Sequence, residues 1–276
     1  MTGRNSLSRR TLAAGLFAGY AAAALSAEAA PVRTDAQGLV VEVVRFRSRD
    51  VMLPAYLARP DAPGRHPAVV VVNEVFGVHD YIKDVCRRLA KRGYAALAPA
   101  FFARVGDPAP LTDYGAIMKI VNAASDAQVL GDVGAALDYL AAAPFAEASR
   151  IAITGFCWGG RIVWLACERF SALKAGAAWY GQLAPGPDGA GQKLWPIDHA
   201  VELKAPVLGL YGGKDPFSDA VPAMRAAIAK AGKPGQIVVY PDAGHGFHAD
   251  YRSSYVEADA RDGWARMLAF FAKQGA

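Results

Sequence analysis

The chain has 276 residues, of which 53% are hydrophobic and 20% charged, so it is long and apolar enough to bury the core of one large globular domain. Its 30 lysines and arginines against 25 aspartates and glutamates give a net charge of +5, and no block of the chain carries charges of a single sign. This composition excludes a disordered chain and argues against a nucleic-acid partner, which would need a basic face.

The first 29 residues have the pattern of a targeting segment. Arg9 and Arg10 form a twin-arginine pair, an apolar run follows at 12–25, and residues 27–29 read Ala-Glu-Ala, like a cleavage site. The apolar run is too short to span a bilayer comfortably. We expect a twin-arginine signal peptide over 1–29 and export of the folded protein by the twin-arginine machinery to the periplasm or medium. No stable membrane insertion is expected once the leader is removed; the alternative is an uncleaved helix that anchors the chain.

After a linker at 30–38, a single domain is expected over 39–276. In chain order, the hydrophobic pattern predicts two hairpin strands (39–47, 51–59), a strand (67–73), a helix (80–92), a strand (94–98), a helix (126–143), a strand (150–154), a helix (162–168), two strands (175–180, 206–211), a helix (220–231), a strand (236–240) and a helix (255–272). Long loops at 99–112 and 181–205 interrupt this order and are of a length that is often functional.

This alternation predicts an α/β fold: a mostly parallel sheet with helices on both faces and an antiparallel hairpin at its N-terminal end. In open sheets of this kind, ligands bind beyond the carboxyl ends of the strands. Candidate site residues are therefore sought just after each predicted strand.

A sharp turn between the strand at 150–154 and the helix at 162–168 carries the most informative motif. It reads Gly-Phe-Cys-Trp-Gly-Gly from Gly155 to Gly160, where hydrolases with a serine nucleophile read G-x-S-x-G. The central side chain of such a turn points out above the sheet. Here it is Cys157, and the N-terminus of the following helix favours its thiolate. The motif predicts a cysteine nucleophile.

Two later motifs supply partners for this nucleophile. Asp215 and His245 each lie on a loop just after a predicted strand, and therefore at the same edge of the sheet as Cys157. Alone, Asp215 could be a turn residue or a helix cap, and His245 a solvated loop residue. Together they follow the α/β-hydrolase order of nucleophile, acid and histidine. We expect a triad in which Asp215 orients His245, and His245 is the partner of Cys157.

Other titratable residues have plainer interpretations. Glu74 follows a predicted buried strand, so it lies at the active edge, where it could be catalytic or could only cap a helix. The remaining histidines are expected to be structural or at the surface, although two of them, His199 and His248, could touch substrate. This group consists of His66, His79, His199 and His248.

The other two cysteines, Cys86 and Cys167, fall in apolar helical patterns and are expected to be small buried side chains. Whether they lie close enough to pair is left open by the sequence. Three cysteines without a metal-binding spacing indicate neither a disulfide scaffold nor a metal site, and no cofactor is implied.

At this point the sequence resembles the dienelactone hydrolase (carboxymethylenebutenolidase) family, a cysteine branch of the α/β-hydrolases. The resemblance covers nearly all of the chain after the leader and rests on five stretches, at 73–77, 102–104, 155–160, 213–215 and 244–247. It implies the α/β-hydrolase fold and a carboxylic ester hydrolase. It further implies that Glu74 contacts the resting thiol and takes its proton when substrate binds, and that the backbone N–H groups of Val75 and Trp158 form the oxyanion hole.

Substrates of this family carry a carboxylate that arginines hold. Arg104 matches one of these arginines, whereas Ala249 occupies the position of the other, and Arg252 could substitute for it. Aromatic side chains at the active edge are candidate walls of the substrate pocket, in particular Phe76, Tyr180 and Phe247.

The resulting hypothesis is an exported cysteine hydrolase that cleaves esters or lactones with enol or aryl leaving groups through a thioester acyl-enzyme. The alternative is a non-catalytic or redox-sensing protein of the same fold that uses Cys157 as its sensor.

Overall fold

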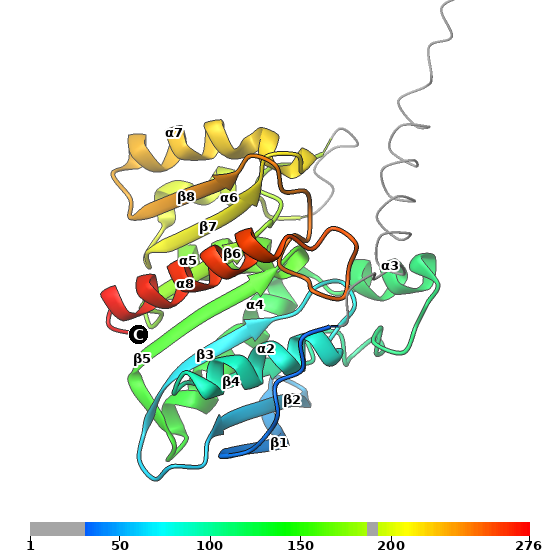
Figure 1. Cartoon of the computed structure of the whole chain (residues 1–276), viewed down its shortest axis with the longest axis vertical. Coiled ribbons are helices and arrows are strands. Elements are labelled where there is room, and N and C mark those ends of the chain that lie inside the picture. Colours follow the sequence, from blue (N-terminus) through cyan, green and yellow to red (C-terminus); the bar gives the residue numbers. More distant parts are fainter. Residues whose placement is uncertain (1–30, 187–192) are drawn as a thin grey trace, which may run out of the picture.

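The computed structural model describes residues 31–186 and 193–276, so the expected leader at 1–29 lies outside the described residues. Its centre is a sheet of eight strands in the order β1-β2-β4-β3-β5-β6-β7-β8 (Figure 1). The strands are β1 (Leu39–Ser48), β2 (Val51–Pro60), β3 (His66–Val72), β4 (Ala95–Pro99), β5 (Ala146–Phe156), β6 (Ala175–Trp179), β7 (Val207–Gly212) and β8 (Gly235–Tyr240).

The pairing of these strands confirms the predicted sheet. β1 pairs with β2 and β2 with β4 in antiparallel register, and from β4 onwards every neighbouring pair is parallel. The four valines at 69–72 in β3 are fully buried, as expected for a strand that is covered on both faces. Because β3, β5, β7 and β8 run parallel, the loops that follow them meet at one edge of the sheet.

Helices cover both faces of the sheet and divide the core in two (Figure 1). One face packs against α2 (Asp80–Lys91) and α8 (Glu257–Lys273). The other packs against α4 (Asp126–Ala142), α5 (Trp158–Arg169) and α7 (Val221–Ala231). All five helices were expected from the sequence, and most of their ends lie within a few residues of the predicted positions.

Two short helices were not expected. α3 (Tyr114–Ala123) begins at Asp113, whose side chain accepts a hydrogen bond from Ala116 N, but it buries only Ile117 and Val121. The sequence does carry a helical signal here, because Tyr114, Ile117, Met118 and Val121 follow helical spacing, and this signal was missed. The second, α6 (Pro196–His199), has four residues, continues into a 3₁₀ turn at Ala200–Glu202 and lies within the predicted second long loop.

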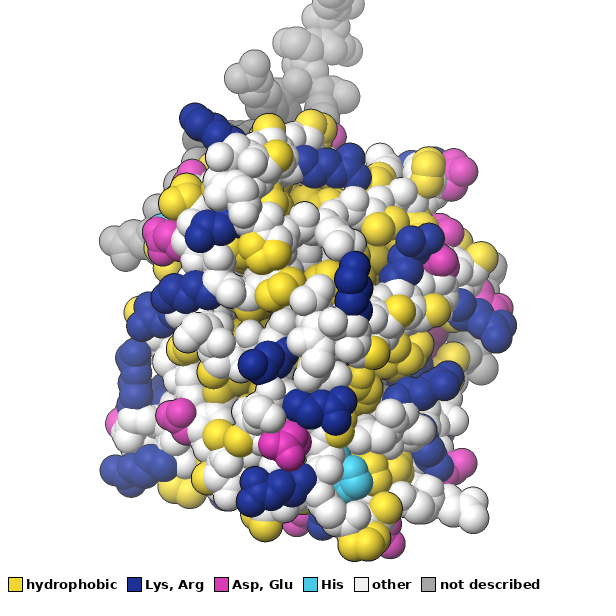
Figure 2. Space-filling model, turned by 90° about the vertical axis from the view of Figure 1, so that its left-hand side faces the viewer, with side chains coloured by type: hydrophobic (Ala, Val, Ile, Leu, Met, Phe, Trp, Pro, Cys, Tyr) yellow, Lys and Arg dark blue, Asp and Glu magenta, His cyan; other side chains and the backbone are white. Residues whose placement is uncertain are grey.

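Charged side chains of both signs lie on the surface (Figure 2). On the face shown in Figure 2, lysine and arginine side chains are spread singly among uncharged and apolar groups instead of forming one basic stripe. Within residues 31–186 and 193–276, none of the helices has both the length and the apolar character needed to span a bilayer.

Candidate active site

The turn between β5 and α5 is a strained nucleophile elbow. Cys157 has φ 56° and ψ −117°, a left-handed conformation that a residue with a side chain rarely adopts. Glycines make the turn possible. A Cβ on Gly159 would lie 2.5 Å from Val72 O, and one on Gly160 would lie 2.5 Å from Trp179 O. The first turn of α5 therefore presses directly against the ends of β3 and β6, and Cys157 stands between them.

The expected acid and histidine are hydrogen-bonded to each other. Asp215 Oδ2 lies 2.7 Å from His245 Nδ1, and its Oδ1 accepts the backbone N–H of Phe217 at 3.0 Å. Asp215 is 3% exposed, so little water competes for its charge. This contact fixes the orientation of the imidazole and leaves Nε2 as the nitrogen that can serve another group.

The charge state of His245 reflects both expected partners. Burial disfavours the imidazolium, but the carboxylate of Asp215, together with the charge and hydrogen bond of Cys157, outweighs burial and raises the pKa of His245 to about 10. Asp215 and Cys157 thus both act on the charge state of His245, and their joint action as a catalytic triad stays a prediction.

Glu74 lies in the loop after β3, fully buried, and is held by three side chains. Tyr251 Oη donates to Oε2 at 2.6 Å, Arg252 Nη2 donates to Oε1 at 3.1 Å, and His79 Nε2 lies 3.5 Å from Oε2. Burial alone would raise the pKa of this carboxyl group, but Arg252, His79 and Tyr251 together lower it to about 2. Glu74 is therefore an ionised, anchored carboxylate in this structure.

The two amides expected to form the oxyanion hole lie on neighbouring loops. Trp158 is the first residue of α5, so its N–H has no acceptor within the helix. Val75 follows Glu74 and is 6% exposed. The contact of Gly159 with the end of β3 brings these loops together. Their joint action on an oxyanion stays a prediction.

The three candidate wall residues differ in what they offer a substrate. Phe76 is partly exposed, and its ring lies under the Arg252 guanidinium at 5.2 Å. Tyr180 is fully buried, and its ring centre lies 5.0 Å from that of His245. Phe247 is also fully buried and packs 5.5 Å from the Tyr180 ring. Tyr180 and Phe247 therefore support His245 from the interior, whereas Phe76 has exposed surface for contact with a substrate.

The arginines matched to substrate binding have partners within the protein. Arg104 Nη1 donates to the buried carboxylate of Asp132 at 2.6 Å, and its Nη2 donates to Ser48 O at 3.0 Å. Ala249 is fully buried. Arg252, the suggested substitute for the arginine missing at Ala249, binds Glu74. A role for Arg104 in substrate binding stays a prediction, and its contacts give it a structural one.

Sequence reasoning missed two tyrosines at the site. Burial and the nearby Cys157 raise the pKa of the Tyr114 hydroxyl, at the start of α3, to about 12. Tyr251 binds Glu74 directly. Neither residue belongs to a motif, but the Asp113 helix cap and the helical spacing of Tyr114, Ile117 and Val121 could have drawn attention to that segment.

The remaining histidines are distributed between interior and surface. His79 contacts Glu74, which its position at a helix start did not suggest. His248 is buried, lies 2.6 Å from Tyr81 Oη, and has its pKa lowered to about 3 by burial and by Arg88. His199 pairs with Glu202 at the surface, and His66 lies 3.1 Å from a backbone carbonyl.

The question of cysteine pairing is settled by the fold. Cys86 in α2 and Cys167 in α5 are both free and fully buried, in cores on opposite faces of the sheet. Burial raises the pKa of both thiols well above the usual range. Among the residues that the structure describes, no group of three or more histidine, cysteine or acidic side chains is arranged to hold a metal ion.

Comparison with known proteins places this geometry in a family. The model of the "Dienelactone hydrolase family" matches residues 53–275. A "Putative carboxymethylenebutenolidase" of Methylorubrum extorquens is 47% identical over 281 residues, covering 100% of this chain and 96% of its own length. One of Salmonella typhimurium is 44% identical over 93% of this chain and 96% of its own.

A solved structure points the same way. The crystal structure of a "Putative Dienelactone Hydrolase" from Klebsiella pneumoniae has a TM-score of 0.80 and 47% identity, and the match covers 85% of this chain and 98% of that one. Fold, motifs and relatives agree: the chain belongs to the dienelactone hydrolase family, α/β-hydrolase-fold enzymes that act on lactone and ester bonds.

Proposed function

We propose that the protein is a cysteine hydrolase that opens lactones or cleaves esters with enol or aryl leaving groups through a thioester acyl-enzyme. The observation that carries the proposal is the strained elbow at Cys157, whose side chain acts on His245 while Asp215 holds the same ring. A positive φ at a residue with a side chain is costly, and such strain is typical of functional sites.

The reaction proceeds in two halves. The thiol proton passes to a base, the sulfur attacks the carbonyl carbon, and the carbonyl electron pair becomes an oxyanion that the Val75 and Trp158 amides stabilise. The oxyanion collapses and breaks the bond to the leaving oxygen, which takes up the proton, and a thioester remains on Cys157. Water then gives a proton to His245 and attacks the thioester, and the acid departs as the thiol is restored.

Sulfur at the nucleophile position limits the substrates. A thiolate, whose conjugate acid has a pKa of ~8.5, is a far better leaving group than an alkoxide. A tetrahedral intermediate with a simple alkyl ester would therefore tend to expel Cys157 again. Enolate and phenolate leaving groups are stable enough to compete, so the proposal includes these esters and excludes amides and simple alkyl esters.

The first proton transfer has two candidate bases. His245 already interacts with Cys157, and its raised pKa favours the imidazolium that forms when it takes the proton from sulfur. Glu74 is the base that family resemblance implies, but it would have to leave Arg252 and Tyr251 first, since those contacts keep its pKa near 2. In this proposal, substrate binding is the event that could release it.

Active-site trapping tests the proposal. We expect incubation with aryl esters and enol lactones, followed by mass spectrometry, to show one acyl group on Cys157, and Cys157→Ala to give neither adduct nor turnover. Cys86 and Cys167 act as internal controls, because both are fully buried. A Glu74→Gln arm separates the bases: slower acylation supports Glu74, and an unchanged rate assigns the proton to His245.

Hydrolysis by Cys157→Ala at the wild-type rate would overturn the assignment of Cys157 as the nucleophile. If none of the esters and lactones is hydrolysed and Cys157 forms a stable sulfenate, the redox-sensing alternative is favoured.

Export is the other part of the proposal, and it rests on the leader pattern at 1–29. We expect the full chain in the periplasmic fraction and the double variant Arg9→Lys/Arg10→Lys in the cytoplasm. If the full chain and the double variant distributed in the same way between periplasm and cytoplasm, this result would contradict the twin-arginine signal.

A further inference from the structure

The turn after His245 carries two of the three residues that hold Glu74, Tyr251 and Arg252, yet it has no helix or strand of its own. Residues 246–252 are a series of turns closed by short-range backbone hydrogen bonds. A segment of this kind keeps one conformation only where side chains fix it, because its backbone alone gives little cooperative stability.

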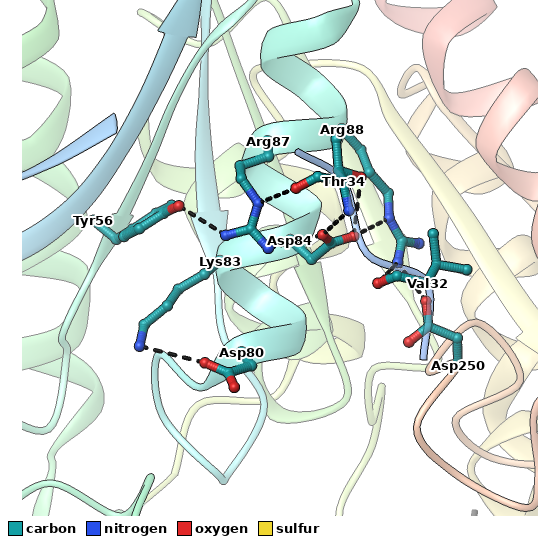
Figure 3. Close-up of polar contacts among 9 residues, drawn as sticks. All are labelled: Val32, Thr34, Tyr56, Asp80, Lys83, Asp84, Arg87, Arg88 and Asp250. Carbon is teal, nitrogen blue, oxygen red and sulfur yellow. Dashed lines mark hydrogen bonds and ion pairs between the residues drawn. The ribbon is translucent and has the colours of Figure 1, made fainter. Parts of the chain in front are cut away.

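Helix α2 supplies two anchors for this turn. Tyr81 Oη lies 2.6 Å from His248 Nδ1, and Arg88 Nη2 donates to the carboxylate of Asp250. Tyr81 and Arg88 are about two helical turns apart and therefore share one face of α2. Figure 3 shows Arg88 reaching from α2 towards Asp250.

The Arg88 guanidinium joins more than these two elements. Its Nε donates to Asp84 Oδ2 at 2.6 Å, while Nη2 binds Asp250 and lies 3.5 Å from Val32 O. The backbone N–H of Thr34 donates to Asp84 Oδ1 at 2.7 Å (Figure 3). One planar fork thus ties α2, the N-terminal segment and the catalytic turn together.

Burial makes the contact between Arg88 and Asp250 important. Asp250 is 2% exposed and Asp84 is 3% exposed. Burial raises the pKa of Asp250, Arg88 opposes this effect, and Asp84 adds to it. Without the Arg88 guanidinium, Asp84 would keep Arg87 at 2.8 Å, whereas the buried Asp250 would lose its cation, and leaving a buried charge without its partner is strongly unfavourable.

We propose that Arg88 is a positioning residue for Glu74: by holding Asp250, it fixes the turn from which the neighbouring Tyr251 and Arg252 reach that carboxylate. The inference rests on the proposed function, in which Glu74 belongs to the reactive centre. The path is short, because Tyr251 and Arg252 follow Asp250 directly and bind Glu74 at 2.6 and 3.1 Å.

A double-mutant cycle tests this role. Arg88→Met and Asp250→Asn each remove the same contact, so each should lower kcat/KM for an aryl ester about tenfold, mainly through kcat, and the double variant should be no worse than the poorer single one. The rate of Cys157 alkylation by iodoacetamide, measured without substrate, should change in all three variants. Circular dichroism confirms that each variant is folded at the assay temperature.

Two further variants complete the design. Lys83→Met removes a cation of the same helix. Its partner, Asp80, is exposed, and Asp80 Oδ1 lies 3.7 Å from Lys83 Nζ, so this variant should leave kcat/KM and the alkylation rate unchanged. Arg88→Lys keeps the charge without the fork, so an intermediate kcat/KM is expected. If Arg88→Met does not fold, Arg88→Lys and Asp250→Asn carry the test.

Folded Arg88→Met or Asp250→Asn with wild-type kcat and alkylation would overturn the positioning role, as would losses that multiply in the double variant. Failure of the proposed function is recognised separately, since the wild-type enzyme would then form no acyl adduct on Cys157.

Discussion

Cys157 occupies a backbone conformation that costs about 1–3 kcal/mol, and the surrounding structure holds it there. The sharp turn at Cys157 and the contact between Asp215 and His245 were predictable, because each is a distinctive residue type just after a strand. The contacts of Glu74 were not. Tyr251 is an ordinary loop residue in the sequence, and Arg252 was considered only for substrate binding. Folding brings both against a carboxylate far away in the chain.

At the same scale, Asp215→Asn tests the charge on His245. The variant should lower kcat by about 10²–10⁴-fold, because the imidazole loses its orienting acceptor and the charge that stabilises imidazolium. It should also change how stability depends on pH. The pKa of His245 is about 10 in the folded protein and ~6.5 when unfolded, so the ion pair stabilises the fold fully below pH ~6.5 and stops doing so as pH rises through ~10.

The melting temperatures of wild type and Asp215→Asn, compared from pH 6 to pH 10, check this. The wild-type advantage should be largest at pH 6 and should shrink steadily towards pH 10. An advantage that grows with pH would mean that His245 is not held as a cation in the folded state.

At the scale of elements, α5 determines the geometry of the site. Its first turn lies so close to β3 and β6 that Gly159 and Gly160 have no room for a side chain. The sequence predicted this turn because glycine spacing is a local signal, and it predicted the long helices because their apolar stripes are wide. It did not predict α3, although Tyr114, Ile117 and Val121 follow helical spacing, and so it also missed Tyr114 at the head of that helix.

At the scale of the whole molecule, the strand order determines which loops meet. Local patterns establish that strands and helices alternate, and therefore that the sheet is mostly parallel. They do not give the order in which β3, β5, β7 and β8 lie, and this order arises from pairing between segments far apart in the chain. The likeness to a known family implied the α/β-hydrolase fold, and the structure supplied the strand order.

The division of the core by the sheet leads to a prediction about the thiols. Cys86 lies against one face and Cys167 against the other, both fully buried, while Cys157 is 7% exposed at the edge. Titration of the native protein with a thiol reagent should therefore detect one rapidly reacting thiol, and all three should react after unfolding under non-reducing conditions. Cys157→Ser should remove the rapid reaction and leave two thiols after unfolding. No titratable thiol in the unfolded Cys157→Ser protein would show that Cys86 and Cys167 had paired, which the sheet between them forbids in this fold.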